Sequence, residues 1–352
     1  MTPPRPIELV RVSGTHREVG LQVGEACEEL IRSGLAATTE PPAGRTRGEQ
    51  LDLAASYRQA TREAFPWLID ELDAIAEAAG VDELAFFAEG IEEIGYEPRL
   101  PKGRCSDLVA VPPATVDGHI VVGHTNDLYP DSEEHLLAIE WAVDDEPVVL
   151  GIGVGPWLSA GFNSAGISFT GNELSPNDER IGIPRSMQFR AMLAQPTLAK
   201  VMEVALHPSR ASSYNNIVVT RDGNAVNIEG SATDAEITGP NPAGVFAHTN
   251  HYACTRMLPF EGDPEYAEMS GIRLARGREL LETAAGTITT ASMCEMLSDH
   301  ENSPHSICRH HRSDIDDYSK TVFWCVCDVT TMRVLFGRGN PCDSIEQEYL
   351  FD

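Results

Sequence analysis

Apolar residues recur every three to four positions over the N-terminal part of the chain, a pattern that predicts helices. An alternating run at 7–12 predicts a first strand, and the periodic segment from His16 to Leu35 predicts the first helix. Gly20 and Gly24 lie about one turn apart in that helix, which leaves its face smooth enough for close contact with another element. Further helices are expected at 50–65, 67–79 and 82–94, after a loop from Thr38 to Arg47.

From Cys105 onward the pattern changes to short apolar runs bounded by turn residues. Strands are expected at 108–111, 119–122, 137–141, 148–152, 166–169, 216–220, 225–229, 244–250, 321–329 and 332–337. Helices are expected at 184–193, 198–206, 271–284 and 292–297. Turns such as Asp117-Gly118 join most of the strands, and the helices come in pairs. This order predicts antiparallel sheets covered by layers of helices rather than a doubly wound parallel sheet.

Cys105 lies at this change of pattern, within the stretch from Pro101 to Asp107. A thiol attacks a carbonyl group as the thiolate, and an unperturbed cysteine is mostly protonated near neutral pH, so it needs a base. A free α-amine, with a pKa of about 7.7–8.0, is such a base, whereas a peptide nitrogen is not. We therefore hypothesise that the chain cuts itself between Arg104 and Cys105, so that Cys105 becomes a chain end carrying both groups.

Acidic residues dominate the composition. The chain of 352 residues has 54 acidic and 26 basic residues, a formal net charge of -28, and its only lysines are Lys102, Lys200 and Lys320. A polyanion repels nucleic acid and anionic membranes, so neither is expected as a partner. Such a surface is typical of a halophilic protein but also of a merely acidic one from a GC-rich genome, and both interpretations stay open. Unfolding midpoints at low and molar salt distinguish them, because salt stabilises a halophilic protein.

No apolar run reaches the roughly 18 residues needed to cross a bilayer, and the residues from Met1 to Pro6 lack the apolar core of a secretion signal. We therefore expect a soluble, cytoplasmic protein. With 42% hydrophobic residues the chain can bury a sizeable core, either as one large domain or as two ordinary ones.

The cysteines and histidines form no recognisable metal motif. Eight cysteines are scattered along the chain, and Cys325 and Cys327 lie on one face of a predicted strand, where packing explains them. His248, His251, His300, His305, His310 and His311 form neither HExxH nor a clear helical i, i+4 pair. The glycine-rich segment 151–156 imitates a nucleotide-binding loop, but Pro156-Trp157 follows it instead of a helix. No metal and no cofactor are expected.

Eight short motifs occur along the chain in one order. They are Arg17-Glu18-Val19-Gly20-Leu21-Gln22-Val23-Gly24, Gly103-Arg104-Cys105-Ser106-Asp107, Gly123-His124-Thr125-Asn126-Asp127, Gly161-Phe162-Asn163-Ser164-Ala165-Gly166, Arg210-Ala211-Ser212-Ser213, His248-Thr249-Asn250-His251, Ser306-Ile307-Cys308-Arg309-His310 and Gly339-Asn340-Pro341-Cys342. In this order they resemble the acyl-coenzyme A:6-aminopenicillanic acid acyltransferase (isopenicillin N acyltransferase-like) family of the N-terminal-nucleophile hydrolases. The resemblance covers nearly the whole chain.

The resemblance implies an α+β fold, a four-layer αββα sandwich of antiparallel sheets formed by residues 1–352 as a single domain. It implies a precursor that cleaves itself before the cysteine, giving fragments 1–104 and 105–352 that stay together as a heterodimer. The implied activity is transfer or hydrolysis of an acyl group through a thioester on Cys105. The expected partner is thus a small-molecule amide or acyl thioester, with a coenzyme A thioester among the candidates. Further oligomerisation is left open.

Carried over motif by motif, the resemblance also implies roles for single residues. Cys105 would be the nucleophile, Asp127 would hold its α-amine, Asn250 would donate to the oxyanion, and Arg309 would organise that acid or a substrate carboxylate. An amide donor at an oxyanion is worth about 3–4 kcal/mol, and the guanidinium fork fits a carboxylate. Lower-grade candidates for substrate binding are Ser106, Asn126 and Asn163.

Structural interpretations of these residues stay open beside the functional ones. Asp127 can cap a turn, Asn250 can bond its own backbone, and Arg309 can form a surface ion pair. The triplet His-Thr-Asn also occurs twice, at 124–126 and 248–250, each time after an apolar strand.

Two other functions stay open as well. A papain-like cysteine hydrolase would keep Cys105 internal and use a histidine such as His251 as its base, and activity of an uncut chain would favour it. A non-catalytic binding protein would keep the fold without maturing, and Cys105 would then not react with an acyl probe.

Overall fold

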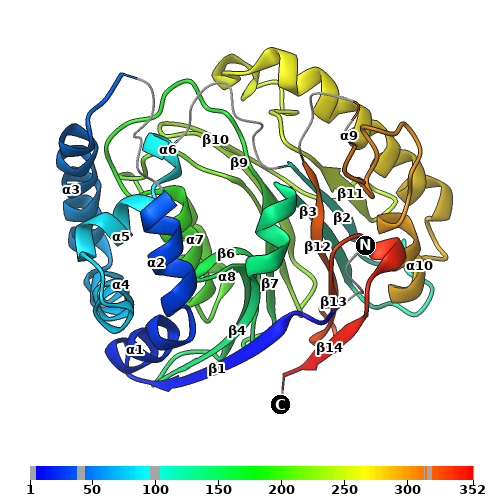
Figure 1. The fold of residues 1–352 in the computed structure, drawn as a ribbon. Coiled ribbons are helices and arrows are strands. Elements are labelled where there is room, and N and C mark those ends of the chain that lie inside the picture. The colour runs from blue at the N-terminus through cyan, green and yellow to red at the C-terminus, as the bar shows by residue number, and fades with distance from the viewer. Residues whose placement is uncertain (1–4, 38–43, 96–103, 313, 315–318, 352) are drawn as a thin grey trace.

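Two β-sheets lie face to face between two layers of helices (Figure 1). The computed structural model describes residues 5–37, 44–95, 104–312, 314 and 319–351. Most of the loop predicted from Thr38 to Arg47, and Gly103 before the predicted cleavage site, lie outside the described residues. No helix in the described part of the chain is both long enough and apolar enough to cross a membrane.

The N-terminal part of the chain forms one strand and a layer of helices, largely as predicted. They are β1 (Glu8–Gly14), α1 (His16–Ala26), α2 (Glu28–Ala37), α3 (Arg47–Ala64), α4 (Pro66–Ala79), α5 (Glu83–Glu89) and α6 (Glu92–Gly95). Thr15 begins α1 with a capping box to Glu18, and Gly80, at φ 66°, ends α4 in the left-handed conformation that glycine favours. The single helix predicted from His16 to Leu35 is instead two helices, α1 and α2, which are separated at Cys27. The apolar period continues across this break and so did not reveal it.

The larger sheet has eight strands in the order β1-β4-β5-β6-β7-β8-β9-β10. The strands after β1 are β4 (Leu136–Val143), β5 (Val149–Val154), β6 (Trp157–Asn163), β7 (Ile167–Asn172), β8 (Asn215–Thr220), β9 (Ala225–Gly230) and β10 (Ala235–Thr238). Neighbours are antiparallel except β1 and β4, which are parallel. No short turn joins that pair, so no hairpin dictates its direction. The glycine-rich segment 151–156 forms the β5–β6 hairpin, with Gly155 at φ 55°.

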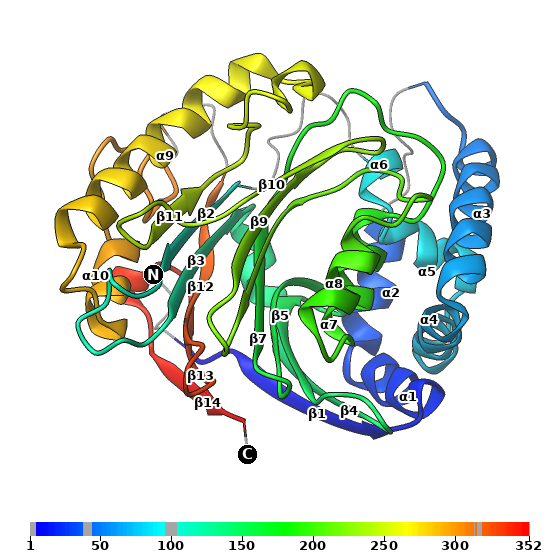
Figure 2. The same ribbon diagram turned by 180° about the vertical axis from the view of Figure 1, so that it is seen from behind.

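The smaller sheet has six strands in the order β11-β2-β3-β12-β13-β14. Its strands are β2 (Arg104–Ala110), β3 (Val121–Leu128), β11 (Val245–His248), β12 (Lys320–Asp328), β13 (Arg333–Arg338) and β14 (Gln347–Leu350). Helices α7 (Arg185–Leu193) and α8 (Leu198–Ala205) join the N-terminal helices on the larger sheet, whereas α9 (Pro264–Ala284) and α10 (Thr290–Leu297) cover the smaller one (Figures 1 and 2). Helix α9 begins earlier than predicted, at the Asp263 cap and Pro264.

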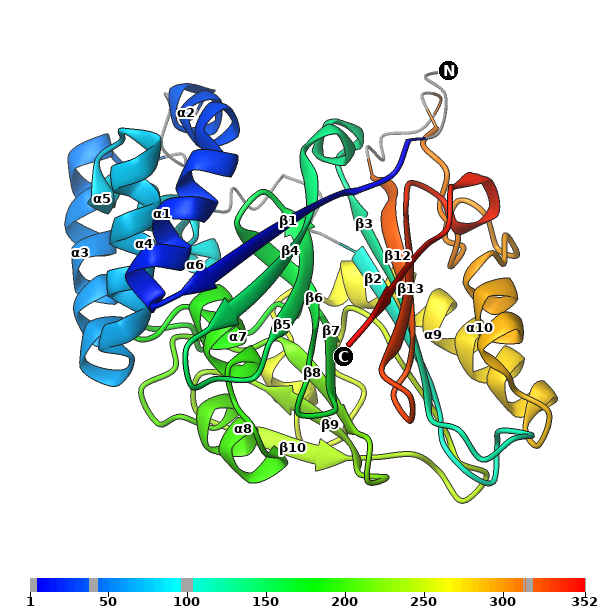
Figure 3. The same cartoon turned by 90° about the horizontal axis from the view of Figure 1, so that it is seen from below.

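Side chains that alternate along the strands divide the interior into three apolar layers. Phe323 and Cys325 of β12 pack between the two sheets, whereas Trp324 and Val326 face the layer under α9 and α10. Val218 of β8 faces the layer under the N-terminal helices. Helices, sheet, sheet and helices therefore follow one another, which confirms the predicted αββα sandwich (Figure 3).

Helix α1 packs closely on α4 at the two glycines that the sequence placed one turn apart. A Cβ atom on Gly20 would lie 2.4 Å from the Glu71 carbonyl oxygen, and one on Gly24 would lie 2.4 Å from the Ile75 carbonyl oxygen. Neither position has room for a side chain, so the predicted close contact is confirmed.

A buried ion-pair cluster fastens this helical layer to the larger sheet. The Glu71 carboxylate of α4 accepts hydrogen bonds from Arg190 Nε at 2.9 Å and Nη2 at 2.8 Å. His16 Nδ1 lies 2.9 Å from the same carboxylate, and His16 Nε2 lies 3.1 Å from Glu146. The Arg190 guanidinium also stacks over Trp141. Burial alone would raise the pKa of Glu71, but Arg190 and His16 lower it below its usual value.

Candidate active site

Cys105 is the second residue of β2, and its side chain points into the space between the sheets. The strand is bonded to β3 on one side and to β11 on the other, with Cys105 directly across from Asn126. The residue is 6% exposed and lines a cavity of about 90 Å³. The other residues lining it are Glu92, Asn126, Leu128, Leu158, Ser159, Gly171, Asn172, Glu173, Phe189, Tyr214 and Asn216. The cavity therefore offers the sulfur both apolar and amide neighbours.

Two side chains hold the main chain of Cys105 on both sides. The Cys105 N–H donates to Asn250 Oδ1 at 2.8 Å, and the Cys105 carbonyl oxygen accepts from Arg273 Nη1 at 2.5 Å. Arg273 Nη2 also donates to Asn250 Oδ1 at 2.8 Å, so the two side chains brace each other. Asn250 Nδ2 donates to the Glu173 carbonyl oxygen at 3.2 Å. Arg273 comes from α9, and no motif in the sequence singled it out.

The sulfur itself is in an environment that disfavours the thiolate. Burial raises the pKa of the Cys105 thiol well above its usual range, and the carboxylates of Asp107 and Asp127 add to the effect. Asn126 Nδ2 lies 3.6 Å from Sγ, close enough for a weak hydrogen bond. A base that acts at the moment of attack is therefore needed.

Asp127 lies next to Asn126 on β3 but points to the other side of the sheet, toward α9. In the β2–β3 register it is directly across from Arg104. Its Oδ1 accepts from the Thr321 hydroxyl at 2.7 Å, and that hydroxyl accepts from the Arg309 N–H at 2.9 Å. Among the described residues its Oδ2 has no hydrogen-bond donor. Burial raises the pKa of Asp127 above its usual value, although Arg273 and Arg309 act against the shift.

The arginines near this carboxylate are themselves buried. Burial and the neighbouring Arg104 lower the pKa of Arg309 to about 10. The Arg104 guanidinium lies over the Tyr266 ring, 5.3 Å from its centroid. The charge on this side of the sheet is thus concentrated where solvent is excluded.

The other two predicted site residues lie outside the cavity. Ser106 points toward α9, where its hydroxyl accepts from Arg273 Nη1 at 3.0 Å. The Asn163 amide donates to the carbonyl oxygens of Leu193 and Gln195, each at 3.0 Å, and so ties β6 to the end of α7. The structure therefore brings together three of the predicted residues: Cys105 and Asn126 line the cavity, and Asn250 holds the Cys105 N–H.

A buried polar network next to the cysteine was not predicted. Asp107 Oδ1 lies 3.0 Å from His124 Nδ1, and Asp107 Oδ2 accepts from Asn172 Nδ2 at 2.7 Å. Asn172 Oδ1 lies 2.8 Å from His248 Nδ1, whose Nε2 lies 3.1 Å from Glu229. In the sheet register the two histidines flank Asp107 from β3 and β11. The repeated His-Thr-Asn triplet was the one signal of this symmetry in the sequence.

The histidine that a papain-like mechanism would need is engaged elsewhere. His251 Nδ1 lies 2.9 Å from the Ser270 hydroxyl, and in the described part of the chain it makes no hydrogen bond with Cys105. Burial and the neighbouring His248 lower the pKa of His251 to about 4.

Comparison with known proteins identifies a family that this chain matches. The family model described as acyl-coenzyme A:6-aminopenicillanic acid acyl-transferase matches residues 115–343. A solved structure of a variant of conjugated bile acid hydrolase from Clostridium perfringens is similar, with a TM-score of 0.43 and 11% identity over 70% of this chain and 97% of that one. Penicillin V acylase from Agrobacterium tumefaciens gives a TM-score of 0.46 and 11% identity over 66% of this chain and 83% of that one. Among curated proteins there is no significant match.

Proposed function

This chain belongs to the acyl-coenzyme A:6-aminopenicillanic acid acyl-transferase family, and we propose that it is a cysteine N-terminal-nucleophile enzyme that first cuts itself between Arg104 and Cys105. The observation that carries the proposal is the pair of side chains, Asn250 and Arg273, that hold the main chain of Cys105 while its sulfur faces a cavity. Because the backbone of Cys105 is held in place, its sulfur and the neighbouring Arg104 carbonyl group have a fixed relative orientation. Such an orientation lowers the barrier to transfer of the Arg104 acyl group to sulfur.

Self-cleavage begins when the Cys105 sulfur attacks the Arg104 carbonyl carbon. The C–N bond breaks, the nitrogen takes up the thiol proton and becomes the α-amine of Cys105, and the Arg104 acyl group passes to sulfur as a thioester. Water then hydrolyses that thioester and releases the carboxylate of Arg104 and the free thiol. The products are fragments 1–104 and 105–352.

Asp127 fits the new α-amine because it lies directly across from Arg104, the residue that cleavage detaches. Its Oδ2 has no donor among the described residues, and an α-ammonium group can supply one. The added positive charge would also offset the burial that raises the pKa of Asp127. In its neutral form the α-amine accepts the thiol proton, which provides the base that the buried sulfur needs.

In the acyl-transfer cycle the thiolate attacks the carbonyl of an amide or a thioester. The proton taken by the α-amine passes to the leaving amine or thiol, and a Cys105 thioester remains. Asn250 Nδ2, which donates to the Glu173 carbonyl oxygen, would turn its donors to the oxyanion. Water or an amine then takes the acyl group. The apolar part of that group fits Leu128, Leu158 and Phe189 along the cavity.

The substrate class we propose is a small-molecule amide or acyl thioester, with a coenzyme A thioester as a candidate donor. The two fragments would remain one heterodimeric domain, because they share one apolar layer. Val19, Leu68 and Phe86 of the first fragment pack in the same layer as Trp141 and Phe189 of the second. Asn163 and Ser106 have no place in the proposed substrate contacts.

Mass spectrometry and N-terminal sequencing of the purified protein test the proposal. We expect two chains, the second beginning at Cys105, and only the intact chain from Cys105→Ala. Cys254→Ala is the matched control, because this half-buried thiol lies outside the cavity and cleavage should proceed normally. An acyl probe should add its acyl mass to the fragment that carries Cys105. Unchanged fragments from Cys105→Ala would exclude Cys105 as the cleaving group.

A further inference from the structure

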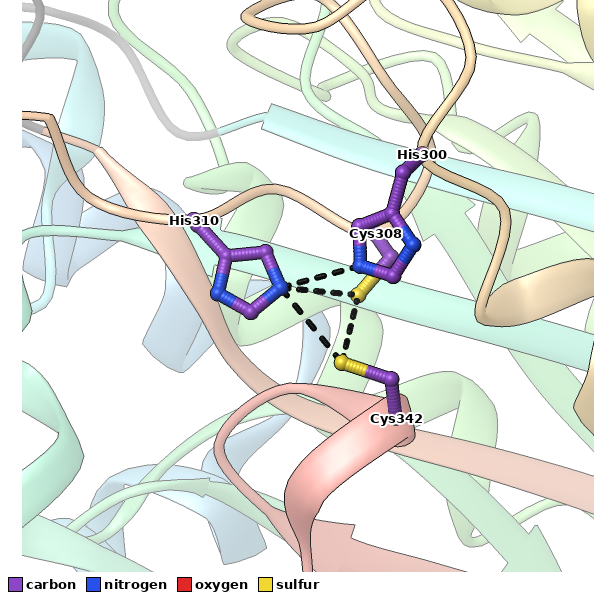
Figure 4. A group of neighbouring side chains, drawn as sticks. All are labelled: His300, Cys308, His310 and Cys342. Atoms are coloured by element: carbon purple, nitrogen blue, oxygen red, sulfur yellow. Dashed lines mark hydrogen bonds between the residues drawn. The ribbon is translucent and has the colours of Figure 1, made fainter.

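Four metal-ligating side chains meet beside the start of β12 and the end of β13 in the smaller sheet, away from the cavity of Cys105. His300, Cys308 and His310 belong to the segment that follows α10, and Cys342 belongs to the short 3-10 turn Pro341–Asp343 after β13. Figure 4 shows the two imidazole rings and the two sulfur atoms directed toward one another. Their ligand atoms all lie within 4.8 Å of one another. None of the four residues lines the Cys105 cavity.

Four of the six distances between these atoms are close to those around a single tetrahedral ion. Around a zinc ion with Zn–N of about 2.0–2.1 Å and Zn–S of about 2.3 Å, two nitrogens are about 3.3 Å apart, two sulfurs about 3.8 Å, and a nitrogen and a sulfur about 3.6 Å. Here the two Nε2 atoms are 3.0 Å apart and the two Sγ atoms 3.6 Å. His310 Nε2 lies 3.8 Å from Cys308 Sγ and 3.4 Å from Cys342 Sγ.

From this geometry we propose that His300, Cys308, His310 and Cys342 bind one Zn²⁺ ion as a closed Cys₂His₂ site. Imidazole and thiolate suit zinc, and four protein ligands leave no open position for water, so the site is structural rather than catalytic. Cys308 is buried, whereas the other three ligands are exposed, so an ion can enter from solvent. The proposal replaces the expectation, based on spacing in the sequence, that the chain binds no metal.

The ion would fix the segment that carries Arg309. Asn340 Nδ2 lies 3.5 Å from Cys308 Sγ and donates to the Arg309 carbonyl oxygen at 2.8 Å, which is the kind of outer contact that orients a metal ligand. The Arg309 N–H in turn donates to the Thr321 hydroxyl that binds Asp127. Zinc at this position would thus hold the loop of Arg309 in place without touching the substrate.

Metal analysis of the purified full-length protein tests the site. We expect about one zinc per chain after expression with added Zn²⁺ and exhaustive dialysis, and less than about a tenth of that in Cys342→Ser or His300→Asn. Replacement by Co²⁺ should give thiolate charge-transfer and tetrahedral d–d absorption, which either variant removes. Cys254→Ser and His119→Asn are the matched controls, because both residues lie outside the cluster, and they should keep their zinc.

Two further measurements separate zinc binding from misfolding and from the cleavage reaction. Chelation should lower the thermal midpoint of the wild type and leave that of Cys342→Ser unchanged. Cys105→Ala should keep its zinc, since the ion is independent of maturation. Absence of zinc, a different metal, equal zinc in the variants, or a Cys308–Cys342 disulfide in peptides from unreduced protein would each overturn the proposal.

Discussion

Two carboxylates, Glu71 and Asp127, are buried to a similar extent, but their pKa values are shifted in opposite directions. Glu71 is 2% exposed and Asp127 is 0% exposed, so both have lost nearly all contact with water. The guanidinium of Arg190 and the imidazole of His16 lower the pKa of Glu71 despite its burial. Around Asp127 burial outweighs Arg273 and Arg309, and its pKa is raised.

The difference lies in how well the partners fit. Arg190 meets Glu71 with two hydrogen bonds, which is the strong geometry for this pair. Among the described residues Asp127 accepts a hydrogen bond from the neutral Thr321 hydroxyl, and its second oxygen has no donor. Breaking a well-matched buried ion pair is costly, whereas a buried carboxylate left short of donors itself lowers stability and is available for a group that arrives later.

The largest effect that separates the two regions should come from Glu71→Gln. This change removes the charge and leaves Arg190 buried without its counter-ion, which costs about 3–5 kcal/mol when a buried pair is broken. Urea unfolding should show that loss, while the catalytic rate per folded molecule stays the same, because Glu71 lies outside the Cys105 cavity.

The surface pair Arg17–Glu77 supplies the control on the same helix. Its side chains are 56% and 55% exposed, so Glu77→Gln should change the free energy of unfolding by less than about 1 kcal/mol. Equal losses from the two variants would contradict a structural role for the buried cluster. The double variant Glu71→Leu/Arg190→Met should unfold less easily than Glu71→Gln, since it leaves no buried charge unpaired.

The next effect should come from Asp127→Asn. Acyl transfer per cleaved molecule is expected to slow about 100-fold, equivalent to about 2.7 kcal/mol, because the α-amine loses its carboxylate. Stability should be unchanged or higher, the reverse of Glu71→Gln, because the raised pKa shows that burial penalises the ionised form. Denaturing gels give the cleaved fraction to which the acyl-transfer rate is normalised, and stability is measured by urea unfolding.

The stability comparison is sharpest in a Cys105→Ala background, where the chain stays uncut and no α-ammonium forms. A carboxyl with a raised folded pKa contributes stability that is present below its unfolded pKa and lost as the pH rises through the folded value. Asp127→Asn should therefore have a higher free energy of unfolding than its parent at pH 7, and the two should be equally stable near pH 4. A clear loss of stability at pH 7 would refute the argument.

The layers of the fold were predictable because they depend on short-range patterns. Helical period, turn residues and paired helices predicted antiparallel sheets covered by helices, and the family resemblance implied the αββα sandwich. Gly20 and Gly24 predicted a close contact of the first helix but did not identify α4 as its partner. The strands missed were β6, β10 and β14. Strands β10 and β14 are short edge strands with alternating polar residues, which carry little apolar signal. The end of α1 at Cys27 carries no helix-breaking residue, so the local sequence did not predict it.

Only the site residues that belong to short sequence motifs were predictable. Cys105, Asn126 and Asn250 stand in short motifs and meet at Cys105, but Arg273 lies on a helix with no local signature. The metal cluster joins Cys308 to Cys342 across 34 positions, and no spacing rule links them. Such contacts arise when neighbouring strands bring separate loops together at their ends, and the spacing of residues along the sequence does not reveal them.

The smallest effect concerns His16, a half-buried member of the Glu71 cluster. Burial alone would lower its pKa, but hydrogen bonds to Glu146 and Glu71 raise it to about 9. The ion pair therefore contributes stability that is fully present below about pH 6.5 and is lost as the pH rises through about 9. Because the side chain is 19% exposed and its partner Glu146 is 24% exposed, solvent screening reduces the contribution to about 1 kcal/mol.

Unfolding measured from pH 6 to pH 10 should thus show a decline in the wild type that His16→Asn lacks. His119 is the matched control, since it pairs with Asp328 at 2.8 Å but is 36% exposed, and its removal should change the profile little. The alkaline window also keeps His16 apart from Asp127, whose effect falls in the acid range. A flat wild-type profile would mean that His16 is neutral in the fold, and that Glu71 depends on Arg190 alone.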